Sequence, residues 1–313
     1  MLTIQRILVP TDLSAGAEEA LRHAAFLADW YDAELHLLNV VGRHMHRYEE
    51  MRARFPYDGE ALDRVLQPEG GVERHLPVHD ELAIVQEQVE HASPPTVIAE
   101  YAEANDVDLI VMGTRGRRGV DRLLMGSVAE EVVRTTACPV LTVLDGLEVA
   151  PGQAFRRILV PVDFSEPSRL AIDHATELAG TYGAEVDLLH VVEEVSLPTA
   201  YGVEPIGFAV PEIVDNSEKA LARMAEEEIG YEHVAVEVRP GYPSTTILDY
   251  VDERNVDLVV IATHGRTGLD RLLMGSVAEK VVRRASCPVF TVKHRGRSLV
   301  ASRRASASAK KKG

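Results

Sequence analysis

The residues of this chain best suited to bind an anion are glycines and a serine that follow an apolar, strand-like segment. Two residues separate Gly113 from Gly116, and nine more separate Gly116 from Gly126 and Ser127, which open a predicted helix. A glycine-rich turn lets backbone N–H groups approach an anion closely, and a helix N-terminus adds unpaired N–H donors and a positive dipole end. This spacing predicts a phosphate cradle.

Two other phosphate-binding motifs are excluded by the sequence. A P-loop requires a Gly-Lys pair, and the chain contains none. A dinucleotide fingerprint requires a glycine-rich turn after the first strand, where this chain has Pro10, Thr11 and Asp12. Asp12 itself has two interpretations: it faces a ligand, or it forms a turn by accepting hydrogen bonds from nearby backbone N–H groups.

The second half of the chain repeats the first. The 25 residues from Gly119 match the 25 from Gly268 at 19 positions, and the segment Arg6–Pro10 recurs as Arg157–Pro161. Each half alternates strand and helix patterns, which predicts two tandem α/β domains with open, mostly parallel, doubly wound sheets. The chain is therefore a duplicated domain, and each half carries its own copy of the site.

The expected boundaries follow from this repeat. We expect domains at residues 1–145 and 156–295, a linker at 146–155 and a disordered basic tail at 296–313. The following strands are expected: residues 6–10, 34–41, 107–112 and 139–144 in the first half, and 158–161, 185–192, 256–262 and 288–293 in the second. Helices are expected after Ser14 and Ser165, where a serine precedes an amphipathic run, and again from Ser127 and Ser276.

The last strand of each half, Val140–Val143 and Val289–Val292, would leave an apolar sheet edge unpaired. We therefore predict that these two strands pair with each other and join the halves as a pseudo-symmetric dimer.

Composition narrows the class of protein. The net charge is −16, and eight of the 33 basic residues lie from Lys293 onward, so the preceding body holds 25 basic against 49 acidic residues. Such an acidic body disfavours nucleic acid as a partner and is typical of proteins adapted to salt. No apolar run approaches the length of a membrane span, so we expect a soluble cytoplasmic protein. Cys138 and Cys287 occupy matching positions and are expected to be small buried side chains.

The glycine spacing, together with Pro10, Thr11 and Asp12 after the first strand, resembles the ATP-binding branch of the universal stress protein family. The resemblance covers nearly the whole chain as a tandem pair. It implies that ATP, or AMP or ADP, binds each half, with Mg²⁺ or Mn²⁺ carried by the phosphates. The residues implied are Pro10, Thr11, Asp12, Val40, Gly113, Gly116, Arg117, Gly126, Ser127 and Val128, and in the second half Pro161, Val162, Asp163, Val191, Gly265, Arg266, Gly275, Ser276 and Val277.

Several alternatives stay open at these positions. Ser127 with Glu130, like Ser276 with Glu279, forms the S-x-x-E pattern of a capping box, so either serine could serve only its helix. Ala262 replaces Gly113 in the second half. A methyl there would obstruct the backbone's approach to phosphate or force an alanine to a positive φ, which puts the second site in question.

Three functions compete. The chain is expected to be a nucleotide-binding regulatory protein that reports its state to a protein client, since no pair of nucleophile and base stands out. A slow ATPase is the first alternative, and an interaction scaffold without nucleotide is the second. The match between the halves lapses between Gly42 and about Glu81, a segment we call the first-half insert. Its histidines, His44, His46, His75 and His79, fit no metal-ligand spacing, so no resident metal is expected.

Overall fold

The computed structural model describes residues 2–42, 54–67, 81–114, 125–144, 155–193, 210–264, 274–293 and 297–300. In the first half they form β1 Arg6–Pro10, α1 Ala15–Tyr31, β2 Glu34–Val41, α3 Gly59–Leu66, β3 Ile84–Glu90, α4 Pro94–Ala104, β4 Leu109–Gly113, α5 Ser127–Thr135 and β5 Val140–Val143. In the second half they form β6 Arg157–Pro161, α6 Glu166–Tyr182, β7 Glu185–Glu193, α7 Val210–Glu228, β8 Val234–Gly241, α8 Pro243–Arg254, β9 Leu258–Ala262, α9 Ser276–Arg284 and β10 Val289–Val292.

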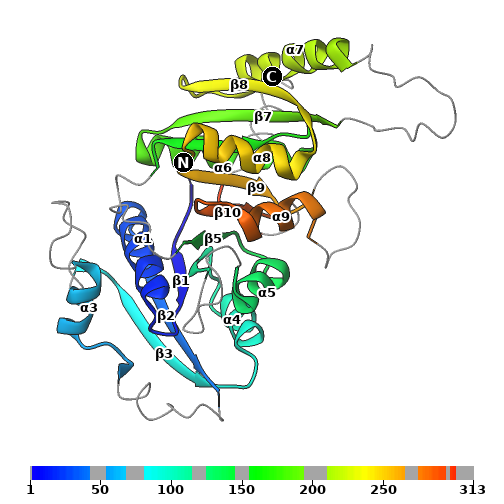
Figure 1. Ribbon diagram of the computed structural model, residues 1–313. Helices are drawn as coiled ribbons and strands as arrows, with labels where there is room; N and C mark the ends of the chain where they lie inside the picture. The colour runs from blue at the N-terminus through cyan, green and yellow to red at the C-terminus, as the bar shows by residue number, and fades with distance from the viewer. Residues whose placement is uncertain are drawn as a thin grey trace, which may run out of the picture.

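The strands form one ten-stranded sheet in the order β3-β2-β1-β4-β5-β10-β9-β6-β7-β8 (Figure 1). Helices cover both faces of this sheet. Those on one face (α1, α3, α6 and α7) bury side chains such as Leu21 and Leu221 in one core cluster. Those on the other face (α4, α5, α8 and α9) bury side chains such as Ile98 and Val281 in a second cluster. The predicted fold class, a tandem of mostly parallel open α/β sheets, is confirmed.

The two halves are joined through their last strands, as predicted. β10 pairs antiparallel with β5, with Phe290 opposite Leu141, whereas the strands within each half are parallel. Two reciprocal side-chain bonds reinforce the pairing: Thr142 Oγ1 donates to the carbonyl of Val289 at 3.1 Å, and Thr291 Oγ1 donates to that of Val140 at 3.2 Å. The pairing covers an edge that each half would otherwise expose.

The segments where the halves diverge contain further elements that were not predicted. α3 lies within the first-half insert, and α7 begins within residues 196–215, where the second half diverges from the first. β3 and β8 form the two outer edges of the sheet. The side chains of β3 are all half-buried or exposed, so this strand lacks the apolar run that marks the central strands.

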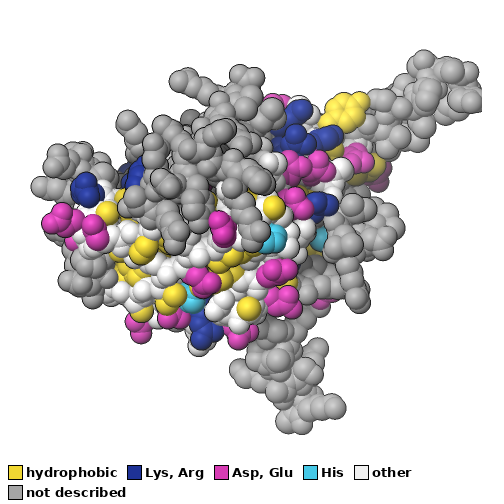
Figure 2. Space-filling view, turned by 90° about the horizontal axis from the view of Figure 1, so that it is seen from below, with side chains coloured by type: hydrophobic (Ala, Val, Ile, Leu, Met, Phe, Trp, Pro, Cys, Tyr) yellow, Lys and Arg dark blue, Asp and Glu magenta, His cyan; other side chains and the backbone are white. Residues whose placement is uncertain are grey.

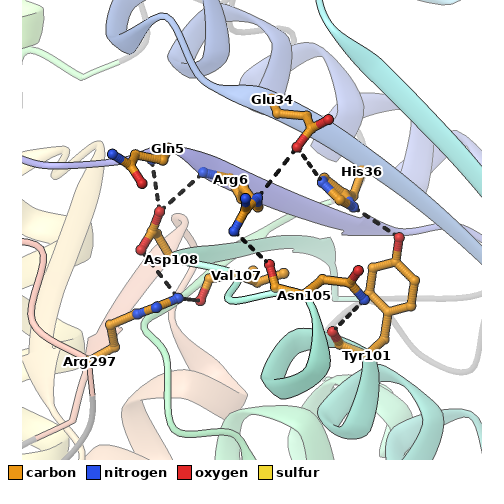
Figure 3. Close-up of polar contacts among 9 residues, drawn as sticks. All are labelled: Gln5, Arg6, Glu34, His36, Tyr101, Asn105, Val107, Asp108 and Arg297. Carbon is orange, nitrogen blue, oxygen red and sulfur yellow. Dashed lines mark hydrogen bonds and ion pairs between the residues drawn. The ribbon is translucent and has the colours of Figure 1, made fainter.

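The start of the C-terminal tail is packed, which differs from the disordered segment expected from residue 296. Arg297 donates to the carbonyl of Val107 at 2.9 Å and lies 3.4 Å from Asp108 (Figure 3). It also donates to Asp106 Oδ1 at 3.0 Å. Leu299 is 1% exposed. Segment 297–300 contains an apolar pair, Leu299 and Val300, which the prediction from the basic composition of the whole tail did not take into account. Residues 301–313 lie outside the described residues.

Residues 2–3 lie side by side with residues 299–300. Leu2 and Val300 form an isolated antiparallel bridge, and the Thr3 N–H donates to the carbonyl of Leu299 at 2.8 Å. His174 on α6 accepts the Leu299 N–H through Nε2 at 3.2 Å. Residues 2–3 and 299–300 thus connect the amino end of the first-half sheet to a helix of the second half.

Side chains of every class reach the surface of the described part. On the face that is seen when the molecule of Figure 1 is viewed from below, acidic side chains are interspersed with basic and apolar ones (Figure 2). Among the described helices, none has the length and apolar character needed to cross a membrane. Both cysteines are buried as predicted, and burial raises the pKa of Cys138 to about 11 and that of Cys287 to about 12.

Candidate functional site

The candidate site of the first half lies at the carboxyl ends of β1 and β4. These two strands are neighbours, and β1 also pairs with β2, so the strand order reverses between β1 and β4. Ligands of open parallel sheets bind at such a reversal, outside the carboxyl ends of the strands. Asp12 follows β1 and Thr114 follows β4, so the fold brings together the two segments that the sequence singled out. β6 and β9 repeat this arrangement.

The turn after β1 is formed by its own side chains. Asp12 Oδ1 accepts the Ser14 N–H at 3.1 Å, and Thr11 Oγ1 accepts the Leu13 N–H at 3.0 Å. Leu13 has a φ of 61°. Asp163 repeats the bond to the Ser165 N–H at 3.0 Å, and Phe164 has a φ of 62°. The interpretation of Asp12 as a turn former is confirmed, and it holds for Asp163 as well.

The N-terminus of α5 is held at the end of β4 by the backbone. The Gly126 N–H donates to the carbonyl of Thr114 at 2.6 Å, and the Gly275 N–H donates to that of Thr263 at 2.8 Å. Gly126 and Gly275 are the N-caps, and neither helix has a side-chain cap. Ser127 and Ser276 are therefore the first helical residues, and the capping-box interpretation is wrong.

This geometry leaves the start of each helix without a side-chain acceptor. The first N–H groups of a helix have no intrahelical partner, and a glycine N-cap cannot supply one. Ser127 and Ser276 are exposed and lie at these starts. The arrangement can bind an oxyanion at the end of β4 or β9.

Gly113 is required by the packing of α1. A Cβ at residue 113 would lie 2.7 Å from the carbonyl oxygen of Gly16 and 3.2 Å from the Ala17 nitrogen. In the second half Ala262 lies partly buried against the corresponding core, and Pro167 stands in place of Gly16. Ala262 is not among the five described non-glycine residues with a positive φ.

The expectation that Ala262 is forced to a positive φ is therefore wrong. The two halves thus differ at this pair of positions, with Gly113 and Gly16 in the first half and Ala262 and Pro167 in the second.

Predicted apolar site residues line the rim of the second core cluster. Val40 and Val128 pack against it partly buried, together with Val89, which the sequence did not single out. Val191 and Val277 occupy the same places in the second half. These valines provide apolar surface beside the starts of α5 and α9 in both halves.

Polar residues that the sequence did not predict support the turn. Asn39, fully buried, donates through Nδ2 to the carbonyl of Thr11 at 2.7 Å. In the second half, His190 Nδ1 lies 2.7 Å from the carbonyl of Val162, and its ring stands 4.6 Å from that of Phe164. Both side chains point from the second strand of their half toward the first, a placement that only the strand register reveals.

Tyr57 brings the first-half insert to this site. Its backbone is paired with the Gln86 side chain, which accepts the Tyr57 N–H and donates to the Tyr57 carbonyl, both at 2.9 Å. Burial chiefly raises the pKa of Tyr57, and the nearby carboxylates of Glu18 and Asp12 raise it further. The insert therefore packs beside Asp12, which no motif indicated.

Part of the predicted cradle lies outside the described residues. These positions are Gly116 and Arg117 in the first half and Gly265 and Arg266 in the second. The neighbouring Arg115, Arg118 and Arg122 and the four histidines of the first-half insert also lie outside the described residues. Thr114 Oγ1, at the start of the first of these segments, is buried without a hydrogen-bond partner among the described residues. Within the same described ranges, no group of three side chains could hold a metal ion.

Comparisons with known proteins agree with this architecture. The model of the universal stress protein family matches residues 3–143 and again residues 154–293. The chain belongs to this family, as a tandem of two such domains.

Individual relatives cover one half or both. Universal stress protein MJ0531 of Methanocaldococcus jannaschii is 37% identical over 142 residues, which is 44% of this chain and 82% of that protein. Universal stress protein Rv2623 of Mycobacterium tuberculosis is 30% identical over 300 residues, which is 92% of this chain and 96% of that protein. A universal stress protein of Archaeoglobus fulgidus shares the fold, with a TM-score of 0.65 at 23% identity over 93% of this chain and 98% of the other.

Proposed function

We propose that this chain is a regulatory protein that binds ATP, or the related AMP or ADP, at the carboxyl edge of each half and reports that state to a protein client. The observation that carries the proposal is the glycine N-cap of α5 and α9. This glycine positions a helix start that has no side-chain cap at the end of β4 or β9, beside the turn that follows β1 or β6. That combination suits the phosphates of a nucleotide.

The proposal assigns roles to several of the predicted residues. Gly126, Ser127, Gly275 and Ser276 offer backbone N–H groups and hydroxyls to the phosphates. Val40 and Val128, with Val191 and Val277 in the second half, supply apolar contact for the base and ribose. Asp12 and Asp163 shape the turn by accepting a backbone N–H through Oδ1. The same carboxylates accept hydrogen bonds from the ribose hydroxyls in this proposal. A divalent cation would be carried by the phosphates.

The direct test is to purify the full chain and identify any bound nucleotide by mass spectrometry, followed by equilibrium dialysis with ATP. The double variant Gly126→Asp, Gly275→Asp places bulk and negative charge beside both helix starts and should abolish binding. At Gly126 the new Cβ would already lie 3.1 Å from the Thr114 carbonyl oxygen. Gly230→Asp is the matched control, because a Cβ there meets no atom within 4 Å and the residue precedes β8 at the opposite end of the sheet.

Binding and hydrolysis are separated in the same samples. If phosphate is released from bound ATP at a rate above that of ATP alone, and the double variant removes this release, the slow ATPase is correct. If the wild-type chain binds no adenine nucleotide, the glycine turns are architectural and the scaffold is correct.

A further inference from the structure

A cleft of about 320 Å³ lies where the last turns of α1 and α6 meet. Trp30 and Tyr31 line it from α1, Glu177 and Gly180 line it from α6, and Tyr231 lines it from the segment before β8. Both helices end just before the strand that follows them begins. The cleft therefore lies at the amino ends of the strands, away from the proposed nucleotide edge, and both halves contribute to it.

Hydrogen bonds fix two of the three aromatic rings in this cleft. The Tyr31 hydroxyl lies 2.7 Å from Thr181 Oγ1, a contact between the two halves. The Tyr231 hydroxyl donates to the carbonyl of Ala184 at 2.6 Å. Trp30 remains 51% exposed, and few large apolar side chains of the described residues are as accessible. A ligand that contacts these rings meets surfaces that are already ordered, so little conformational entropy is lost on binding.

The electrostatic character of the cleft favours positive charge. Its lining residues include the carboxylate of Glu177 and no lysine or arginine. The C-terminal ends of α1 and α6 both point into this region, and neither has a basic residue in its last turn. A helix C-terminus carries a negative partial charge that attracts cations. Burial chiefly raises the pKa of Tyr31, and Glu177 raises it further, which places that carboxylate beside the ring.

We propose that this cleft is a binding site for a small organic cation of the alkylammonium class. Aromatic rings attract such cations through the negative faces of their π-systems, and a neighbouring carboxylate adds direct charge pairing. A methylated ammonium group is large and weakly hydrated, so it suits an open aromatic cleft better than a metal ion does. The site is independent of the proposed nucleotide function, and neither depends on the other being correct.

Trp30 provides a direct measurement, because it is the only tryptophan in the chain. Choline chloride is titrated into the full chain while the fluorescence of Trp30 is followed, with sodium chloride at equal ionic strength as reference. The neutral isostere 3,3-dimethylbutan-1-ol is titrated in parallel. We expect a saturable change with choline and at least about fivefold weaker binding of the alcohol. No saturable change with choline, or equal affinity for the two compounds, overturns the proposal.

Two variants test the location. Glu177→Gln keeps the shape of the side chain and should weaken choline binding about fivefold, whereas Glu166→Gln removes the same charge at the far end of α6 and should not. Gly180→Leu fills open space, since a Cβ there meets no atom within 4 Å, and leucine is the better helix former. It should abolish the choline response while the chain unfolds at an equal or higher urea concentration. Undiminished choline binding to a folded Gly180→Leu chain overturns the assignment to this cleft.

Discussion

Gly113 at the end of β4 faces the backbone of Gly16 in α1, so closely that a Cβ on residue 113 would lie 2.7 Å from the Gly16 carbonyl oxygen. A glycine that the sequence assigned to phosphate contact thus has a packing role that is complete without any ligand. The contact explains why the motif starts with glycine in the first half.

This relationship predicts the effect of Gly113→Ala. The added methyl forces α1 away from β4 and should lower the free energy of unfolding by about 1–3 kcal/mol. Urea unfolding of the full chain measures it. Ala262→Gly is the reverse change at the matching position and should cost no more than about 1 kcal/mol. A Gly113→Ala chain of unchanged stability that has lost ATP binding would contradict the packing role and restore the phosphate role.

The two proposed nucleotide sites should differ in affinity. We expect the first half to bind ATP more tightly, because its loop carries Arg115, Arg117, Arg118 and Arg122 whereas the second loop carries Arg266 and Arg271. Each charge-assisted hydrogen bond to phosphate contributes roughly 1.5–3 kcal/mol. Calorimetric titration of the two single variants decides the order. Gly126→Asp should remove the tighter phase and Gly275→Asp the weaker one, and the opposite result reverses the ranking.

Two matching histidines should make stability depend on pH. Burial lowers the pKa of His174 to about 4, and burial together with Arg22 lowers that of His23 to about 4. Above pH 6.5 both are neutral in the folded and unfolded chain. Between pH 6.5 and 4 only the unfolded chain takes up these protons, so the free energy of unfolding falls by roughly 3 kcal/mol for each histidine.

The measurement is urea unfolding of the chain and of His23→Phe over this pH range. Phenylalanine keeps the stacking of residue 23 on Phe155, where the ring centroids are 5.7 Å apart, and it replaces two ring nitrogens without hydrogen-bond partners. The pH dependence should become shallower by about half of the histidine contribution. An unchanged slope would show that His23 titrates normally in the folded chain.

The segment from Arg297 to Val300 should stabilise the chain although it belongs to a basic tail. Deleting residues 297–313 removes the contacts of Arg297 with Asp106 and Val107 and the buried side chain of Leu299. We expect a loss of about 2–4 kcal/mol. Deleting only residues 301–313 is the control and should change stability by no more than about 0.5 kcal/mol. Equal effects of the two deletions would assign the stabilisation to the tail beyond Val300.

The first half expressed alone should associate with itself. Residues 1–144 end with β5, whose partner in the full chain is β10. The exposed edge can pair with β5 of a second copy, because the antiparallel arrangement is self-complementary. Analytical ultracentrifugation should show a dimer, whereas a monomer at high concentration would indicate that the edge is protected in another way.

The duplication, the class of fold and the pairing of the last strands were determined by the sequence itself. Gly119 and Gly268 begin nearly identical segments, and periodicity alone places the central strands, because a strand buried on both faces must be apolar throughout. Edge strands carry no such signature. β3, with the polar run Gln86, Glu87 and Gln88, was therefore missed, as was β8.

Only the tertiary structure decided what individual side chains do. Gly113 and Ser127 read alike as phosphate-binding residues in the linear motif, yet the first is set by the approach of α1 and the second begins a helix that Gly126 caps. Tyr57 and Arg297 carry no motif, and they reach their partners across gaps of 29 and 189 residues, from Tyr57 to Gln86 and from Arg297 back to Asp108. Such contacts depend on how helices and loops pack in three dimensions, whereas local periodicity reports only which face of each element is buried.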